Sequence, residues 1–224
     1  MGLVLKKEDI KIKTDSNCII GVMGNYKEFL RSLRKYQDDW SLVQVSDILL
    51  RHFNEEKHVE SFEKVAKATL HEFDLSEEFL QKKINDLSNG EKKILEYLIL
   101  LMENKRVMVI DEPFRDLDYF WKKKIIILLK KIIKETNKTI FIGSNQSDVI
   151  YSICNKILLI KNKKWVYDDI NNVFGNNEIL NDFGIEEPLI VKFIRLAKEK
   201  NVNLEYTNDI RDLIKEVYKN VEEE

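Results

Sequence analysis

The sequence predicts an α/β fold with a mostly parallel sheet flanked by helices. Short apolar runs at residues 18–23, 107–110 and 139–144 support this prediction, because β-branched runs of this length are typical of buried parallel strands. Stretches with helical periodicity lie between the runs. In α/β sheets the carboxyl ends of such strands are where ligands bind, so the residues that follow each run are the candidate site.

Two adjacent carboxylates, Asp111 and Glu112, end the run at 107–110, and Pro113 follows them. One carboxylate at such a position can hold a hydrated Mg²⁺, and its neighbour can orient a water for attack on a phosphoryl group. The alternative is a solvated helix cap, which needs no ligand.

Upstream of these carboxylates, Ser88 is a good helix N-cap, followed by apolar residues at helical spacing from Ile94 to Met102. A helix N-terminus with a flanking glycine, here Gly90, offers N–H groups and a positive dipole end to a phosphate. A plain helix cap is again the alternative. Residues 115–118 predict a polar turn before a helix at 119–135.

The order and spacing of these segments resemble ABC-type ATPases. LSNGE at 87–91 is similar to the LSGGQ signature, VMVIDEPF at 107–114 resembles the Walker B strand, and RDLD at 115–118 resembles the D-loop. The resemblance implies ATP and Mg²⁺ as cofactors, with Asp111 on the metal and Glu112 as the catalytic glutamate. It also implies four nucleotide-contacting residues in the signature and the D-loop: Ser88, Asn89, Gly90 and Asp118.

Residues 21–28 have the strand, glycine turn and helix context of a P-loop. Gly21 takes the place of the first glycine of the pattern G-x-x-x-x-G-K-[ST], Gly24 lies in the turn, and Lys27 takes the place of the phosphate-binding lysine. We expect these three residues to bind the cofactor. Lys27 as an ordinary surface lysine is the alternative.

Two substitutions weaken this P-loop. Tyr26 replaces the second glycine, whose missing side chain lets the backbone N–H groups close round the phosphates. Glu28 replaces the hydroxyl residue that binds Mg²⁺, and a carboxylate there would repel the phosphates. Glu28 as a direct metal ligand is the alternative. We therefore expect a degenerate Walker A segment.

Further features of the family are altered. Asn145 stands where the family has a histidine that contacts the γ-phosphate, and an amide carries no positive charge to stabilise a transition state. Gln37 is the candidate Q-loop residue, with Gln44 as its rival. The 20 residues before Gly21 hold no aromatic residue to stack adenine, and the short stretch from Gly21 to the signature implies a reduced antiparallel β-subdomain.

We expect an ATPase domain at 1–182, with a helical subdomain at about 41–90, and a C-terminal helical extension at 183–224. The extension predicts a helix that opens near Pro188 and a second helix after Thr207. It is similar to the extension of energy-coupling-factor ATPases of cobalt and vitamin uptake, which helps to hold the ATPase dimer. Two amphipathic helices that cover a sheet edge are the alternative.

Composition excludes several other classes of protein. With 37 basic and 39 acidic residues, no nucleic-acid partner is expected. Cys18 and Cys154 lie in apolar segments and are expected to be buried thiols. The three histidines lack metal-ligand spacing. Without a signal peptide or an apolar run of membrane-span length, we expect a cytoplasmic protein, which a transmembrane partner could hold at the membrane.

ABC ATPases work as head-to-tail pairs in which the P-loop of one subunit faces the signature of the other. This sequence retains the signature and the D-loop and alters the P-loop, so it predicts an ATP-binding subunit that completes the site of an intact ATPase partner beside a membrane transport subunit. Its own site is expected to be weak or inactive. A regulatory or scaffold protein on the same fold, or a homodimeric ATPase with an atypical P-loop, are the alternatives.

Overall fold

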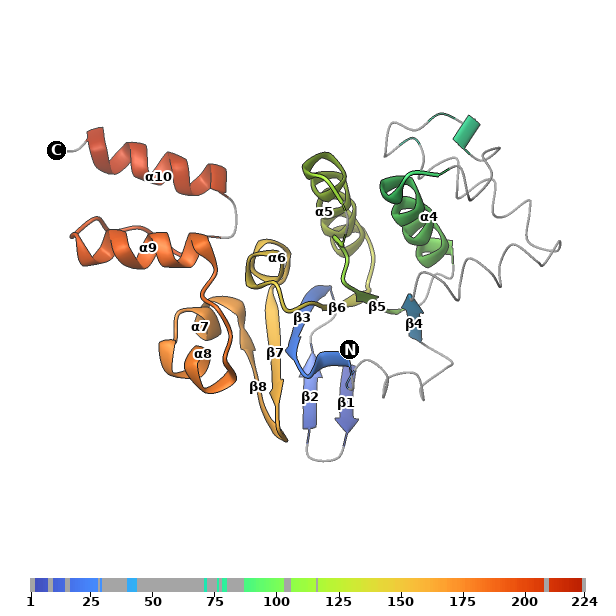
Figure 1. Cartoon of the computed structure of the whole chain (residues 1–224), viewed down its shortest axis with the longest axis horizontal. Coiled ribbons are helices and arrows are strands. Elements are labelled where there is room, and N and C mark those ends of the chain that lie inside the picture. The colour runs from blue at the N-terminus through green and yellow to red at the C-terminus, as the bar shows by residue number, and fades with distance from the viewer. Residues whose placement is uncertain are drawn as a thin grey trace.

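The computed structural model describes residues 3–7, 10–14, 17–27, 29, 40–43, 71, 76, 78–79, 87–102, 106–115, 117–207 and 210–222. The described part is built on one central sheet with helices along it (Figure 1). None of the helices in these residues is both long enough and apolar enough to cross a membrane.

The central sheet has six strands in the order β4-β5-β6-β3-β7-β8. All neighbouring strands are parallel except β8, which runs antiparallel to β7. The strands are β3 (Cys18–Gly24), β4 (Trp40–Val43), β5 (Val107–Asp111), β6 (Thr139–Gly143), β7 (Lys156–Lys161) and β8 (Lys164–Asp169). The predicted mostly parallel sheet is confirmed.

The side chains of these strands alternate between two hydrophobic clusters, as the period of two in a strand requires. In β3, Ile19 and Met23 belong to the larger cluster, whereas Cys18, Ile20 and Val22 belong to the smaller one on the opposite face. Strands buried on both faces are the reason why the sequence shows continuous apolar runs here.

Three helices lie on the same side of the sheet: α4 (Asn89–Met102), α5 (Tyr119–Glu135) and α6 (Ser147–Ile153) (Figure 1). Their buried residues join the larger cluster. The opposite cluster contains Tyr26 and Phe29, which follow β3. The predicted helix at 119–135 is confirmed with these bounds.

A separate two-stranded antiparallel sheet precedes the central one. It pairs β1 (Leu3–Lys7) with β2 (Ile10–Thr14). In Figure 1 this hairpin lies on the side of the central sheet away from α4, α5 and α6. Both of its strands are five residues long.

The predicted domain limits differ from the elements at two points. Residues 40–43 form β4, so the expected start of a helical subdomain at about 41 falls inside the central sheet. Most of the helical patterns expected at 45–83 lie outside the described residues. Two helices that the sequence reading did not anticipate, α7 (Ile170–Phe174) and α8 (Asn177–Phe183), follow β8, and α8 crosses the expected boundary at 182.

The C-terminal residues form α9 (Leu189–Glu199) and α10 (Ile210–Glu222). They pack together through a third cluster of Ile194, Leu204 and Leu213. Pro188 caps α9, as the sequence predicts, and the Leu189 N–H donates to the Asp148 carboxylate of α6 at 2.7 Å. In Figure 1 this helix pair lies at the end of the molecule opposite α4.

Candidate nucleotide half-site and signature

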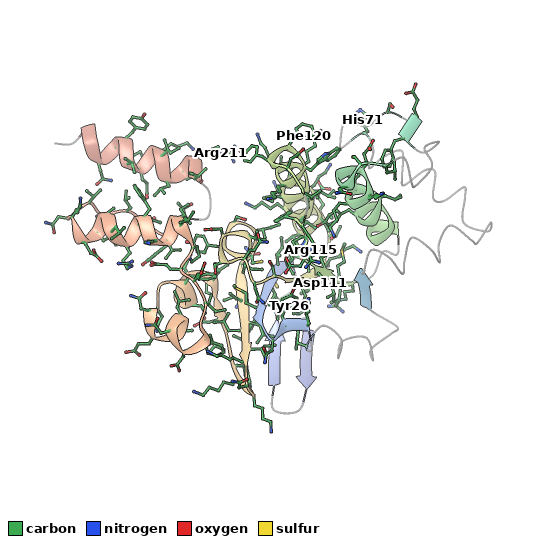
Figure 2. All side chains as sticks on the ribbon, in the orientation of Figure 1. Tyr26, His71, Asp111, Arg115, Phe120 and Arg211 are labelled. Carbon is green, nitrogen blue, oxygen red and sulfur yellow. The ribbon has the colours of Figure 1, made fainter. Side chains whose placement is uncertain are left out.

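The carboxyl ends of β3, β5 and β6 bring three polar side chains together. The Tyr26 hydroxyl donates a hydrogen bond to Glu112 Oε1 at 2.8 Å, and Ser144 Oγ donates to Glu112 Oε2 at 3.0 Å. Both oxygens of the predicted catalytic carboxylate therefore have donors within this chain. Figure 2 labels Tyr26 and Asp111 near the middle of the molecule, where β3 and β5 end.

The backbone conformation of Glu112 is unusual, and a backbone hydrogen bond stabilises it. Its φ of 47° lies in the left-handed region, which non-glycine residues adopt rarely and often at functional sites. Its N–H donates to the Gly143 carbonyl at 2.8 Å, which ties the end of β5 to β6. The Ser144 hydroxyl in turn accepts the Gln146 N–H at 3.2 Å.

Tyr26 is almost completely enclosed, with 1% of its surface exposed. Burial, the hydrogen bond to Glu112 and the negative charge of Asp111 all raise the pKa of its phenol above the ordinary value. The hydroxyl therefore stays protonated and acts as a donor to the carboxylate.

The first four residues of the predicted P-loop segment, 21–24, belong to strand β3. The Gly24 N–H donates to Asn145 Oδ1 at 2.8 Å, and the Asn25 N–H donates to the Ile160 carbonyl at 2.8 Å. In a P-loop such amides cradle phosphates. Here these two are bonded to the protein itself, and Asn145, predicted to face the γ-phosphate, holds one of them.

Both glycines of this segment also have packing reasons for lacking a side chain. A Cβ at Gly21 would lie 2.4 Å from Ile150 Cγ2 of α6, and one at Gly24 would lie 2.2 Å from the Ile160 carbonyl oxygen. Gly24 further adopts a φ of 82°, which favours glycine. Lys27 is exposed. A role for these three residues in cofactor binding stays a prediction.

Three of the other candidates, Glu28, Gln37 and Gln44, lie outside the described residues. In sequence, Gln44 directly follows β4, whereas Gln37 precedes it. Because β4 is parallel to β5, its carboxyl end lies at the edge that carries Asp111. The choice between Gln37 and Gln44 for a Q-loop stays a prediction.

The signature forms the N-terminus of α4, and Ser88 caps it as predicted. The Ser88 N–H donates to Glu91 Oε2 at 2.8 Å, and the Glu91 N–H donates to Ser88 Oγ at 3.2 Å, which is a reciprocal capping box. Ser88 and Asn89 are exposed. The signature thus presents a preformed helix N-terminus at the surface.

A tryptophan joins the signature to the predicted D-loop. Asp118 caps α5 by accepting the Trp121 N–H at 3.0 Å, and the Trp121 indole lies against Gly90. The sequence reading missed Trp121 and Ser144. Trp121 lies three residues after the D-loop aspartate, and Ser144 directly precedes Asn145. These sequence positions could have identified both residues as candidates for the site.

The P-loop half-site consists of Gly24, Tyr26, Asp111, Glu112, Ser144 and Asn145. The implied cofactors are ATP and Mg²⁺, and the donors of this half-site can be compared with what they need. Asp111 Oδ1 is buried without a hydrogen-bond partner, which fits a nearby cation. Among the described residues, however, no group of three or more His, Cys, Asp and Glu could hold a metal ion. Among the described residues, the amides of Gly24 and Asn25 and the Tyr26 hydroxyl are already hydrogen-bonded within the chain, so in this arrangement these groups are not free to bind a triphosphate.

Comparisons with known proteins identify similar sequences and folds. A family model described as ABC transporter matches residues 5–115, about half of the chain. A putative ABC transporter ATP-binding protein of Vibrio parahaemolyticus is 30% identical over 134 residues, which cover 59% of this chain and 23% of the relative. The energy-coupling factor transporter ATP-binding protein EcfA2 of Acetivibrio thermocellus is 29% identical over 146 residues, 65% of this chain and 52% of the relative.

Solved structures show the same fold. CbiO1 of Clostridium perfringens, part of the ABC transporter complex cbiONQ, superposes with a TM-score of 0.58 at 18% identity over 86% of this chain and 96% of that chain. A nucleotide-free ATP-binding cassette from an ABC transporter gives 0.61 at 14% identity over 82% of this chain and 96% of that chain. The chain spans less than half the length of the first curated relatives it matches. The fold and the sequence matches together show that this chain belongs to the ABC transporter ATPase family.

Proposed function

We propose that this chain is an ABC transporter ATP-binding subunit, of the energy-coupling-factor type, that pairs with an intact ATPase and completes its partner's nucleotide site. Ser88, Asn89 and Gly90 would contact the triphosphate bound by the partner's P-loop. The chain's own half-site would bind nucleotide weakly and hydrolyse it slowly or not at all. A membrane transport subunit would complete the assembly.

The observation that carries this proposal is a difference between the two halves of one chain. Ser88 and Asn89 of the signature are exposed, Gly90 is buried against Trp121, and the Ser88–Glu91 capping box lies at the N-terminus of α4, a 14-residue helix. The P-loop half is filled by Tyr26, whose hydroxyl is bonded to Glu112. Among the described residues, this difference supports a phosphate contact at the signature rather than at the P-loop half.

The electrostatics of the signature support phosphate binding from outside. The first N–H groups of a helix lack intrahelical acceptors, and the helix dipole makes this end positive. The Glu91 carboxylate is engaged by the Ser88 N–H. Asn89, the first residue of α4, is exposed and can face an incoming nucleotide.

Asn89→Asp is a sharp test of this role. A carboxylate suits the first turn of a helix, so stability is kept or slightly raised, but it repels a phosphate. We expect at least a tenfold loss of phosphate release by the pair that this chain forms with an intact ABC ATPase. Asn177→Asp is the matched control, because Asn177 is exposed and is the first residue of α8.

The isolated chain supplies the second arm of the test. Titration with ATP and Mg²⁺ should show weak binding and no steady phosphate release. Tight binding with sustained turnover by the isolated chain would refute the proposal, as would an Asn89→Asp pair that hydrolyses ATP at the unmodified rate.

One observation favours the homodimeric ATPase as a second candidate. The buried Asp111 Oδ1 without a hydrogen-bond partner is suited to a cation that accompanies nucleotide. This candidate requires Glu112→Gln to dimerise when ATP and Mg²⁺ are added, which size-exclusion chromatography with light scattering would measure. A Glu112→Gln protein that stays monomeric with both ligands would exclude it.

A further inference from the structure

Tyr26 stands where the P-loop pattern has its second glycine, and its side chain is almost completely enclosed. Only 1% of its surface is exposed, and the ring belongs to the smaller core cluster with Phe29 and Val109. A glycine at this place has no side chain to meet a phosphate, whereas the Tyr26 side chain reaches Glu112, which directly follows β5.

The Tyr26 hydroxyl is hydrogen-bonded to Glu112, the carboxylate that the family uses for catalysis. It donates to Glu112 Oε1 at 2.8 Å, while Ser144 Oγ occupies Oε2 at 3.0 Å. A general base must accept a proton from a water in hydrogen-bond reach. With a protein donor on each oxygen, Glu112 serves here as an acceptor for two side chains.

The backbone N–H groups that precede Tyr26 are also hydrogen-bonded within the chain. The amides of Gly24 and Asn25 are bonded to Asn145 Oδ1 and the Ile160 carbonyl, both at 2.8 Å. A triphosphate would have to displace the phenol and break these two hydrogen bonds. Three separate features therefore oppose its entry.

We propose that Tyr26 is the resident occupant of this chain's own triphosphate site, and that Glu112 anchors its hydroxyl instead of activating water. This inference deepens the proposed function, on which it rests for the idea that the own half-site is not used. It explains why a chain with an altered P-loop keeps the glutamate: without Glu112 the buried phenol would lose its acceptor.

A double-mutant cycle on the full chain tests the anchor. Tyr26→Phe and Glu112→Ala should each lower Tm by roughly 3–8 °C, because each leaves a buried polar group without its partner. The double variant should lower Tm by clearly less than the sum, because the two changes remove the same hydrogen bond.

Tyr151→Phe provides the matched control. Tyr151 is also 1% exposed, and its hydroxyl donates to Asn171 Oδ1 at 2.9 Å, away from Glu112. Its Tm change should add to that of Glu112→Ala. If the Tm changes of Tyr26→Phe and Glu112→Ala also add in the double variant, the inference is overturned.

Nucleotide binding tests whether Tyr26 occupies the triphosphate site. Tyr26→Gly should bind a fluorescent ATP analogue with Mg²⁺ at least tenfold more tightly than the unmodified chain, while Tyr26→Phe, which keeps the ring, should not. Equal affinity of the Gly variant and the unmodified chain would contradict the inference. If Tyr26→Gly does not fold, the Tm cycle decides alone.

The two proposals can fail separately. A missing coupling between Tyr26 and Glu112 removes the anchor, yet the Asn89→Asp effect on the pair can persist. Conversely, strong coupling with an inactive pair, or with no effect of Asn89→Asp, leaves Tyr26 as the occupant and removes the pairing role.

Discussion

The indole of Trp121 lies so close to Gly90 that a methyl group at position 90 would come within 2.4 Å of Nε1. The same tryptophan donates its backbone N–H to Asp118. One residue therefore connects the signature at the start of α4 with the D-loop at the start of α5. Displacement of Trp121 should disturb both segments together.

Gly90→Ala tests this connection through the sign of its effect. In an exposed helix the change would stabilise by up to about 1 kcal/mol, because alanine has the higher helix propensity. Against the indole we expect a net loss of roughly 1–2 kcal/mol in the free energy of unfolding, measured by urea denaturation. Asn89→Ala, at the exposed neighbouring position, should change it by less than about 0.5 kcal/mol. A stabilised Gly90→Ala protein would show that the indole does not constrain the signature.

The buried Tyr151 phenol should make the protein less stable in alkaline solution. Burial, with smaller contributions from Tyr206 and Asp169, raises the pKa of its phenol to about 12. A raised folded-state pKa means that its contribution is complete below pH 10, the ordinary tyrosine value, and is lost as the pH rises through 12. The difference in unfolding free energy between the unmodified chain and Tyr151→Phe should shrink by about 1–2 kcal/mol between pH 9 and 11.5. A difference that stays constant over this range would contradict the raised pKa.

The two cysteines should be unreactive in the native protein. Cys18 and Cys154 are both buried thiols, and Cys154 directly follows the last residue of α6. Burial first, and then the nearby Cys18, raises the pKa of the Cys154 thiol. Ellman's reagent should modify neither cysteine in native buffer and both in guanidinium chloride. A thiol that titrates rapidly without denaturant would show that its cluster opens.

Local sequence signals were sufficient for most individual elements. Ser88 as an N-cap and the polar turn at 115–118 lie within one helical turn of the starts of α4 and α5, so local residue types predicted where these helices begin. The buried strands were predictable because a strand covered on both faces needs a continuous apolar run. The short helices α7 and α8 were missed, because five and seven residues give little periodicity to detect.

The sequence by itself determined the helix caps, the strand cores and the family motifs, because these depend on residues that are neighbours in the chain. Only the tertiary structure decided which side chains share the half-site. Tyr26 meets a carboxylate 86 positions away, and the Gly24 N–H meets an amide oxygen 121 positions away. These contacts exist because β3 pairs with β6, and β6 with β5, at the same sheet edge, and that strand order is set by packing of the whole chain rather than by any local pattern.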